Sequence, residues 1–129
     1  MVLGGRGEQA AAKFLQRAGY RIIARNLDTP GGEADLVCVK ARDTMLVLVE
    51  VKSRIRAAGS HTPPPTAAIN AKKRARLVNT ARAIKSKPEF HTRPIRIDVI
   101  TVEYQSVQDR SPQITHFVSA VSGLGRLGR

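Results

Sequence analysis

The spacing of apolar and polar residues predicts an α/β domain. Residues 6–18 place apolar side chains on one face of a helix, and Gly19 is suited to end it. Alternating or continuous apolar runs predict strands at residues 20–25, 33–39, 45–53, 94–102 and 113–118. Residues 66–87, rich in Ala, Lys and Arg, predict a long basic helix that ends before Pro88. We expect one domain at residues 1–121 and a mobile, Gly-rich basic tail at 122–129.

The second and third predicted strands bring acidic residues together if they pair as an antiparallel hairpin. Only an odd sum of partner residue numbers, such as 85, places apolar side chains opposite apolar ones, because the side-chain repeat of a strand is two residues. At a sum of 85, Asp35 faces Glu50, and Glu33 faces Lys52. The Cβ atoms of Asp35 and Glu50 are then about 4.5–5.5 Å apart, and the like charges repel each other. We therefore expect a positive group between them.

A hard divalent cation suits this pair of carboxylates. Mg²⁺, or Mn²⁺ in its place, is held by one or two carboxylates, with waters and phosphate oxygens completing its coordination. Lys52 shares the face of Glu50 and can stabilise charge on a phosphate under attack. These groups match metal-assisted phosphodiester hydrolysis. The alternative is an ordinary exposed ion pair, since Glu-x-Lys on a strand is common.

The amino-acid composition indicates the kind of partner that the protein binds. The 129 residues include 22 Lys and Arg against 10 Asp and Glu, a formal charge of +12. Such a surface binds phosphate backbones by releasing their counterions, so nucleic acid is the expected partner. The basic segments lack the large apolar faces that lie in a membrane surface. A single cysteine, Cys38, and the absence of long apolar runs indicate a cytoplasmic protein without disulfides.

The motifs in their order resemble a known family. Gly7-Glu8, the tract at 32–37, the tract at 48–54 and Ile97-Asp98-Val99 are similar to those of the YraN-like family of small bacterial proteins. That family belongs to the PD-(D/E)xK nuclease superfamily, whose members include Holliday-junction resolvases. Ala34 stands where the superfamily name has proline, and the triple proline at 63–65 is unusual.

The resemblance implies a three-layer α/β/α restriction-endonuclease-like core with a mixed sheet. It implies that Asp35, Glu50 and Lys52 are catalytic, that Glu8, Asp35 and Glu50 hold the metal, and that Glu33 lies at the edge of the site. Without it, Glu8 is an acid that favours a helix N-terminus. It also implies a homodimer, because the resolvases it resembles are dimers.

Further basic residues are candidates for phosphate contact: Arg54 and Arg56 after the third strand, and Lys72, Lys73 and Arg76 on the basic helix. The alternative for them is solvation that keeps the chain soluble. We expect an endonuclease that acts on DNA, branched DNA included. The first alternative is a nucleic-acid-binding module that keeps the nuclease fold without cutting, and the second is a structural RNA-associated protein.

Overall fold

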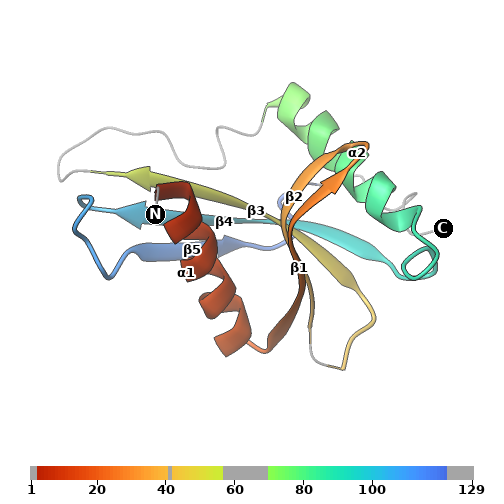
Figure 1. Cartoon of the computed structure of the whole chain (residues 1–129), viewed down its shortest axis with the longest axis horizontal. Coiled ribbons are helices and arrows are strands. Elements are labelled where there is room, and N and C mark those ends of the chain that lie inside the picture. Colours follow the sequence, from red (N-terminus) through yellow and green to blue (C-terminus); the bar gives the residue numbers. More distant parts are fainter. Residues whose placement is uncertain (1–2, 41, 57–69, 122–129) are drawn as a thin grey trace.

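The computed structural model describes residues 3–40, 42–56 and 70–121. This part of the chain forms, in order, α1 (Leu3–Arg17), β1 (Tyr20–Thr29), β2 (Gly32–Lys40), β3 (Leu46–Ile55), α2 (Ala71–Lys85), β4 (Ile95–Tyr104) and β5 (Gln113–Phe117). The strands follow their sequence order in one sheet. β3 and β4 are parallel and the other neighbours are antiparallel, so the sheet is mixed, as expected (Figure 1).

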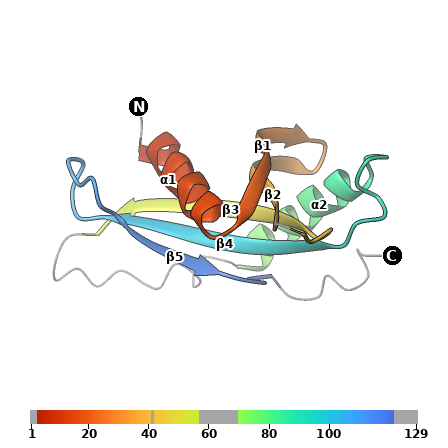
Figure 2. The same ribbon diagram turned by 90° about the horizontal axis from the view of Figure 1, so that it is seen from below.

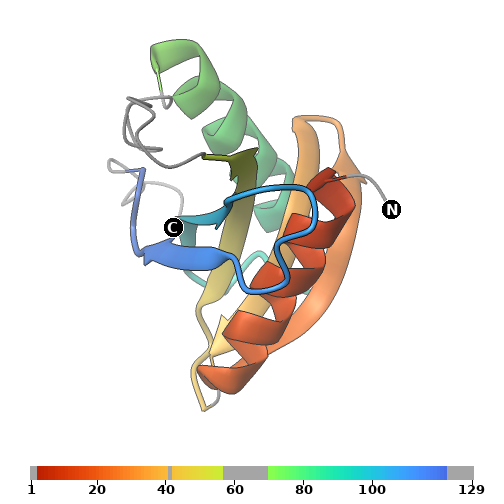
Figure 3. The same cartoon turned by 90° about the vertical axis from the view of Figure 1, so that its left-hand side faces the viewer.

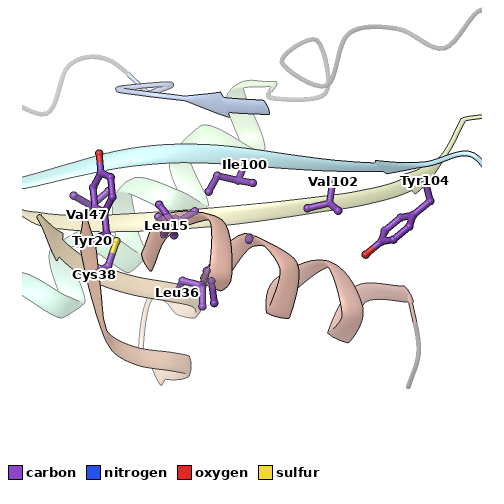
Figure 4. Close-up of a cluster of buried hydrophobic side chains, with 11 residues drawn as sticks. Leu15, Tyr20, Leu36, Cys38, Val47, Ile100, Val102 and Tyr104 are labelled. Atoms are coloured by element: carbon purple, nitrogen blue, oxygen red, sulfur yellow. The ribbon is translucent and has the colours of Figure 1, made fainter. Parts of the chain in front are cut away.

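The two helices cover opposite faces of the sheet. Val47 and Val49 of β3 pack in one core with α1, and Leu46 and Leu48 pack in a second core with α2. All four side chains are at most 1% exposed, which confirms β3 as a central strand covered on both sides. Figure 2 shows α1 lying over the sheet, and Figure 4 shows the core beneath it, where Cys38 is a buried apolar residue. The expected three-layer α/β/α arrangement is confirmed.

A glycine lets α1 approach β3 closely. Ala11 and Leu15 are fully buried against the sheet, and Gly7 lies one turn earlier on the same helix. A Cβ atom on Gly7 would lie 1.6 Å from Oγ of Ser53 and 2.8 Å from its Cβ. Glycine inside a helix is unfavourable by about 0.5–1 kcal/mol relative to alanine, so its presence here reflects the tight contact. The contact also places the neighbouring Glu8 near the end of β3.

The turn between β1 and β2 is docked on α2. Oγ1 of Thr80 donates to the carbonyl oxygen of Gly31 at 3.2 Å, and a Cβ on Gly31 would lie 2.3 Å from the carbonyl oxygen of Asn79. Gly32 has a φ of 135°, which side chains rarely adopt. Two adjacent glycines therefore allow the turn to touch the helix backbone, and this contact fixes α2 relative to β2.

We expect Gly31→Ala to destabilise the fold by about 1–3 kcal/mol, because backbone atoms cannot yield as a flexible side chain does. Urea unfolding followed by circular dichroism measures the change. Gly4→Ala is the matched control, since a Cβ at Gly4 meets nothing within 4 Å. That variant should be neutral or more stable by up to about 1 kcal/mol. Equal urea midpoints for Gly31→Ala and Gly4→Ala would contradict the close contact between the β1–β2 turn and α2.

Several element boundaries differ from those expected. β1 continues to Thr29 because Leu27 pairs with Ala34 and Asp28 with Glu33, which outweighs the local turn signals. α2 begins at Ala71, where Asn70 caps it by accepting from the backbone N–H of Lys73 at 2.9 Å. Most of the loop expected at 54–65, the start of the helix expected at 66, and the tail at 122–129 lie outside the described residues. Among the described helices, none has the length and apolar character needed to span a membrane.

Candidate active site

The candidate site lies in a fork between β2 and β3. Their paired residues run from Val39 and Leu46 to Leu36 and Val49, and the residue numbers of every pair add up to 85, as predicted. Beyond the last pair the β1–β2 hairpin curves away from β3 (Figure 1). The backbone N–H of Val51 donates to Oδ2 of Asp35 at 2.9 Å. The fork is thus closed by a carboxylate side chain and not by a further backbone pair.

Asp35 and Glu50 contact each other inside this fork. Burial raises the pKa of Asp35, the hydrogen bond from Val51 lowers it, and the charge and hydrogen bond of Glu50 raise it again. The charge of Glu8 raises it further, and the resulting pKa is about 7. The prediction that Asp35 and Glu50 point to the same side is confirmed. Asp35 is therefore only partly ionised at neutral pH, because burial and a neighbouring carboxylate both disfavour its charged form.

Glu50 is surrounded by cations. Its carboxylate is nearly buried, and Oε2 lies 2.9 Å from Nη2 of Arg76, 3.5 Å from Nζ of Lys73 and 3.8 Å from Nζ of Lys52. Lys52 comes from the same strand, two residues on, whereas Lys73 and Arg76 come from α2. Lys73 and Arg76, expected to contact phosphates, therefore also belong to the carboxylate site. A long-range helix contact of this kind leaves no signal in the local sequence.

The other acids are placed less closely. Glu8 is near enough for its charge to act on Asp35, and Glu33 is exposed on β2, where it lies opposite Asp28. Within residues 3–40, 42–56 and 70–121, no three acidic, histidine or cysteine side chains form a group that could hold a metal ion. The metal set of Glu8, Asp35 and Glu50 therefore stays a prediction, with Asp35 and Glu50 as the pair in contact.

The basic residues after Lys52 have a partner that the sequence did not reveal. Nε and Nη2 of Arg54 lie 2.9 and 2.8 Å from Oε2 of Glu103, and Nη1 of Arg56 lies 3.6 Å from the same atom. Arg54 and Glu103 are partners across the parallel strands β3 and β4. A pairing between strands separated by a helix cannot be read from local spacing. Lys72, by contrast, is exposed on α2, as a phosphate-contacting residue must be.

Asp98 forms a separate buried network. Its carboxylate accepts both Nε and Nη2 of Arg96 at 2.8 Å and the backbone N–H of Ser119 at 2.9 Å, and lies 2.7 Å from Nε2 of His116. Burial acts to raise the pKa of Asp98, but the hydrogen bonds from His116, Arg96 and Ser119 hold that pKa below its usual value. Asp98 is thus an ion-paired residue of the core.

Comparison with known proteins supports the family resemblance that the motifs indicate. The model of the uncharacterised protein family UPF0102 matches residues 7–102, which include all four motif tracts. UPF0102 proteins from Rhodopirellula baltica, Symbiobacterium thermophilum and Nitratidesulfovibrio vulgaris are 32%, 43% and 38% identical to this chain. These alignments cover 95%, 78% and 95% of this chain and 72%, 81% and 87% of the relatives.

Among solved structures, Pyrococcus furiosus SfsA in complex with Ca²⁺ aligns with a TM-score of 0.44 and 15% identity, over 89% of this chain and 63% of that one. The family assignment does not depend on this structural alignment. It rests on the family model, which matches residues 7–102, and on the three UPF0102 relatives. The expected YraN-like membership is confirmed, and the chain belongs to the uncharacterised protein family UPF0102.

Proposed function

We propose that this protein is a metal-dependent nuclease that hydrolyses DNA phosphodiesters at the fork between β2 and β3. The observation that carries the proposal is the contact between Asp35 and Glu50 in a partly buried fork, where burial first and then Glu50 raise the pKa of Asp35 to about 7. A strained carboxylate pair of this kind is typical of a functional site, because folding alone gains nothing from the repulsion. The resemblance of the tract at 48–54 to PD-(D/E)xK nucleases supports the same assignment.

The donor set fits Mg²⁺ or Mn²⁺. Asp35 and Glu50 offer hard carboxylate oxygens, and the repulsion between them is relieved by positive charge. Glu8 would add its charge from α1. A bound divalent cation supplies a water of lowered pKa and neutralises charge on the phosphate. Loss of the Asp35 proton makes the fork more anionic, so we expect metal affinity to rise with pH through about 7.

The cations around the fork have distinct roles in this proposal. The Lys52 side chain is 38% exposed, so its ammonium can reach a phosphate while staying 3.8 Å from Glu50. It would stabilise charge that develops during attack. Lys73 and Arg76 reach Glu50 from α2 and would hold that carboxylate in place. Lys72, Arg54 and Arg56 would position the backbone of the substrate.

One observation favours a non-catalytic alternative. Oε2 of Glu50 already has three cationic neighbours, and these ion pairs compete with a metal for the same oxygen. A nucleic-acid-binding module with the nuclease fold would keep such pairs intact. The two functions differ in one measurable property, which is turnover of DNA in the presence of metal.

The experiment incubates the protein with linear duplex, branched and single-stranded DNA and Mn²⁺ or Mg²⁺. We expect cleavage that stops in EDTA, and we expect Lys52→Met to lower its rate by about 100-fold while DNA binding is retained. Lys40→Met is the control, because Lys40 is exposed at the opposite end of β2. Absence of cleavage by the unmodified protein on every substrate, with binding preserved, would replace the nuclease by the binding module.

A further inference from the structure

A groove lies on the α1 side of the sheet, away from the α2 face that carries Glu50. It has a volume of about 580 Å³ and runs between α1 and the loop that joins β4 to β5. Figure 3 shows this loop lying across the helix. Phe14, Tyr104 and Ile114 contribute apolar surface to the groove. This volume falls within the range of about 300–1,000 Å³ that is typical of ligand sites.

Cations dominate the charged lining of the groove. The lining includes Arg6, Lys13, Arg17 and Arg110 against a single acid, Asp109. Lys13 and Arg17 are one turn apart on α1, where like charges weaken a helix unless an anion is near. Among the described residues, neither they nor Arg110 take part in an ion pair. Three cations of the groove are therefore available to an anionic ligand.

The wall opposite α1 is the β4–β5 loop, and hydrogen bonds hold it in place. Nη1 and Nη2 of Arg6 donate to the carbonyl oxygens of Val107 and Asp109 at 2.7 and 2.8 Å, and its guanidinium lies 4.8 Å from the centre of the Tyr104 ring. The Asp109 carboxylate accepts the backbone N–H groups of Gln105 and Ser111, each at 2.9 Å. Both carboxylate oxygens of Asp109 thus accept hydrogen bonds from the backbone of the loop.

The groove connects with the end of β3. A smaller pocket of about 140 Å³ shares Tyr104, Asp109 and Ser111 with the groove and is also lined by Arg56. Arg56 follows the strand that carries Glu50 and Lys52. Glu103 and Asp109 also line this smaller pocket, and Arg56 pairs with Glu103, so the free positive charge lies in the groove itself.

We propose that this groove binds the phosphate backbone of DNA as a second contact, with Lys13, Arg17 and Arg110 on the phosphates. The inference rests on the proposed action on DNA, but it assigns a surface that is distinct from the fork. Charge complementarity carries it: Lys13 and Arg17 on α1 and Arg110 on the opposite loop have no ion-pair partner among the described residues, and together they match the repeating charge of a phosphate backbone. Contacts to phosphates carry no base specificity. The groove therefore strengthens binding without selecting a sequence.

The test measures binding of a short fluorescent DNA duplex by anisotropy, in EDTA so that cleavage cannot occur. Lys13→Gln/Arg17→Gln should reduce the slope of log affinity against log salt by about 2, and weaken binding by about 10-fold to 100-fold at 0.1 M salt. The matched control is Arg25→Gln/Lys40→Gln, which removes the same charge from exposed positions on β1 and β2. We expect the control to keep a slope close to that of the unmodified protein.

The possible outcomes distinguish a failure of the proposed groove from a failure of the proposed nuclease function. Equal losses in both double variants would show that only net charge matters, and would overturn the groove. If Lys13→Gln/Arg17→Gln binds DNA like the unmodified protein, the groove proposal is also overturned, but the proposed cleavage at the fork is not affected. If the unmodified protein binds no DNA at any salt concentration, the proposed function and the groove are both wrong.

Discussion

Asp98→Asn is expected to lower the free energy of unfolding by about 3–5 kcal/mol, because removing one partner of a buried ion pair leaves the other charge uncompensated. Asp98 is 0% exposed, and the Arg96 side chain that it binds is only 20% exposed. Arg96 also donates to the hydroxyl of Tyr20 at 2.9 Å, so the network ties β4 to β1. A loss of this size lowers the melting temperature by about 10–20 °C.

Thermal unfolding followed by circular dichroism at pH 7 measures this effect. Asp28→Asn is the matched control: Asp28 is exposed and lies opposite Glu33, so its change should stay within about 0.5 kcal/mol. Arg96→Leu/Asp98→Asn should recover part of the loss, because no charge is then left unpaired. A single variant as stable as the unmodified protein would contradict the network. Unchanged cleavage below its melting temperature would separate Asp98 from the reaction.

Asp35→Asn is expected to change stability and activity in opposite directions. The amide still accepts the hydrogen bond from Val51 but cannot repel Glu50, so the variant should be more stable at pH 8 by about 1–2 kcal/mol, allowing for the partial exposure of this group. Cleavage should fall by about 1000-fold, since an oxygen ligand and its charge are lost. Unfolding curves and initial cleavage rates measure the two effects.

The direction of the pH dependence follows from the raised pKa. Asp35 has a pKa of about 7 in the folded chain against 3.8 as a free group, so the folded state binds more protons between these values. The stability of the unmodified protein therefore falls as pH rises from about 4 to 7, and stays reduced above that range. Asp35→Asn should lack this contribution and differ little from the unmodified protein below about pH 4.

Metal addition gives an independent readout. Mn²⁺ should raise the melting temperature of the unmodified protein at pH 8 and leave that of Asp35→Asn unchanged, because binding to the folded state alone stabilises it. Asp28→Asn on the neighbouring strand β1 is the control, since this exposed carboxylate lies outside the predicted metal set and should affect neither stability nor cleavage. An Asn variant less stable than the unmodified protein at pH 8 would show that the carboxylates do not repel.

Local patterns in the sequence were sufficient to predict the hairpin of β2 and β3 and the facing acids. The register follows from the two-residue repeat, because an even sum would set the acidic face of β2 beside the face of β3 that carries only Val47, Val49 and Val51. The same reasoning identified Lys52 beside Glu50. It failed for the partners of Glu50 on α2 and for Glu103, which meet their partners only once distant elements pack.

The sequence by itself determined the strand periods, the mixed α/β class, the excess of positive charge and the side that Asp35 shares with Glu50. These depend on near neighbours and on the alternation of side chains. Only the tertiary structure decided where the hairpin leaves β3, which cations reach Glu50, and that α1 and the β4–β5 loop enclose a basic groove. Such features arise from helix docking and strand order, and the contacts involved join residues as far apart as Arg6 and Asp109.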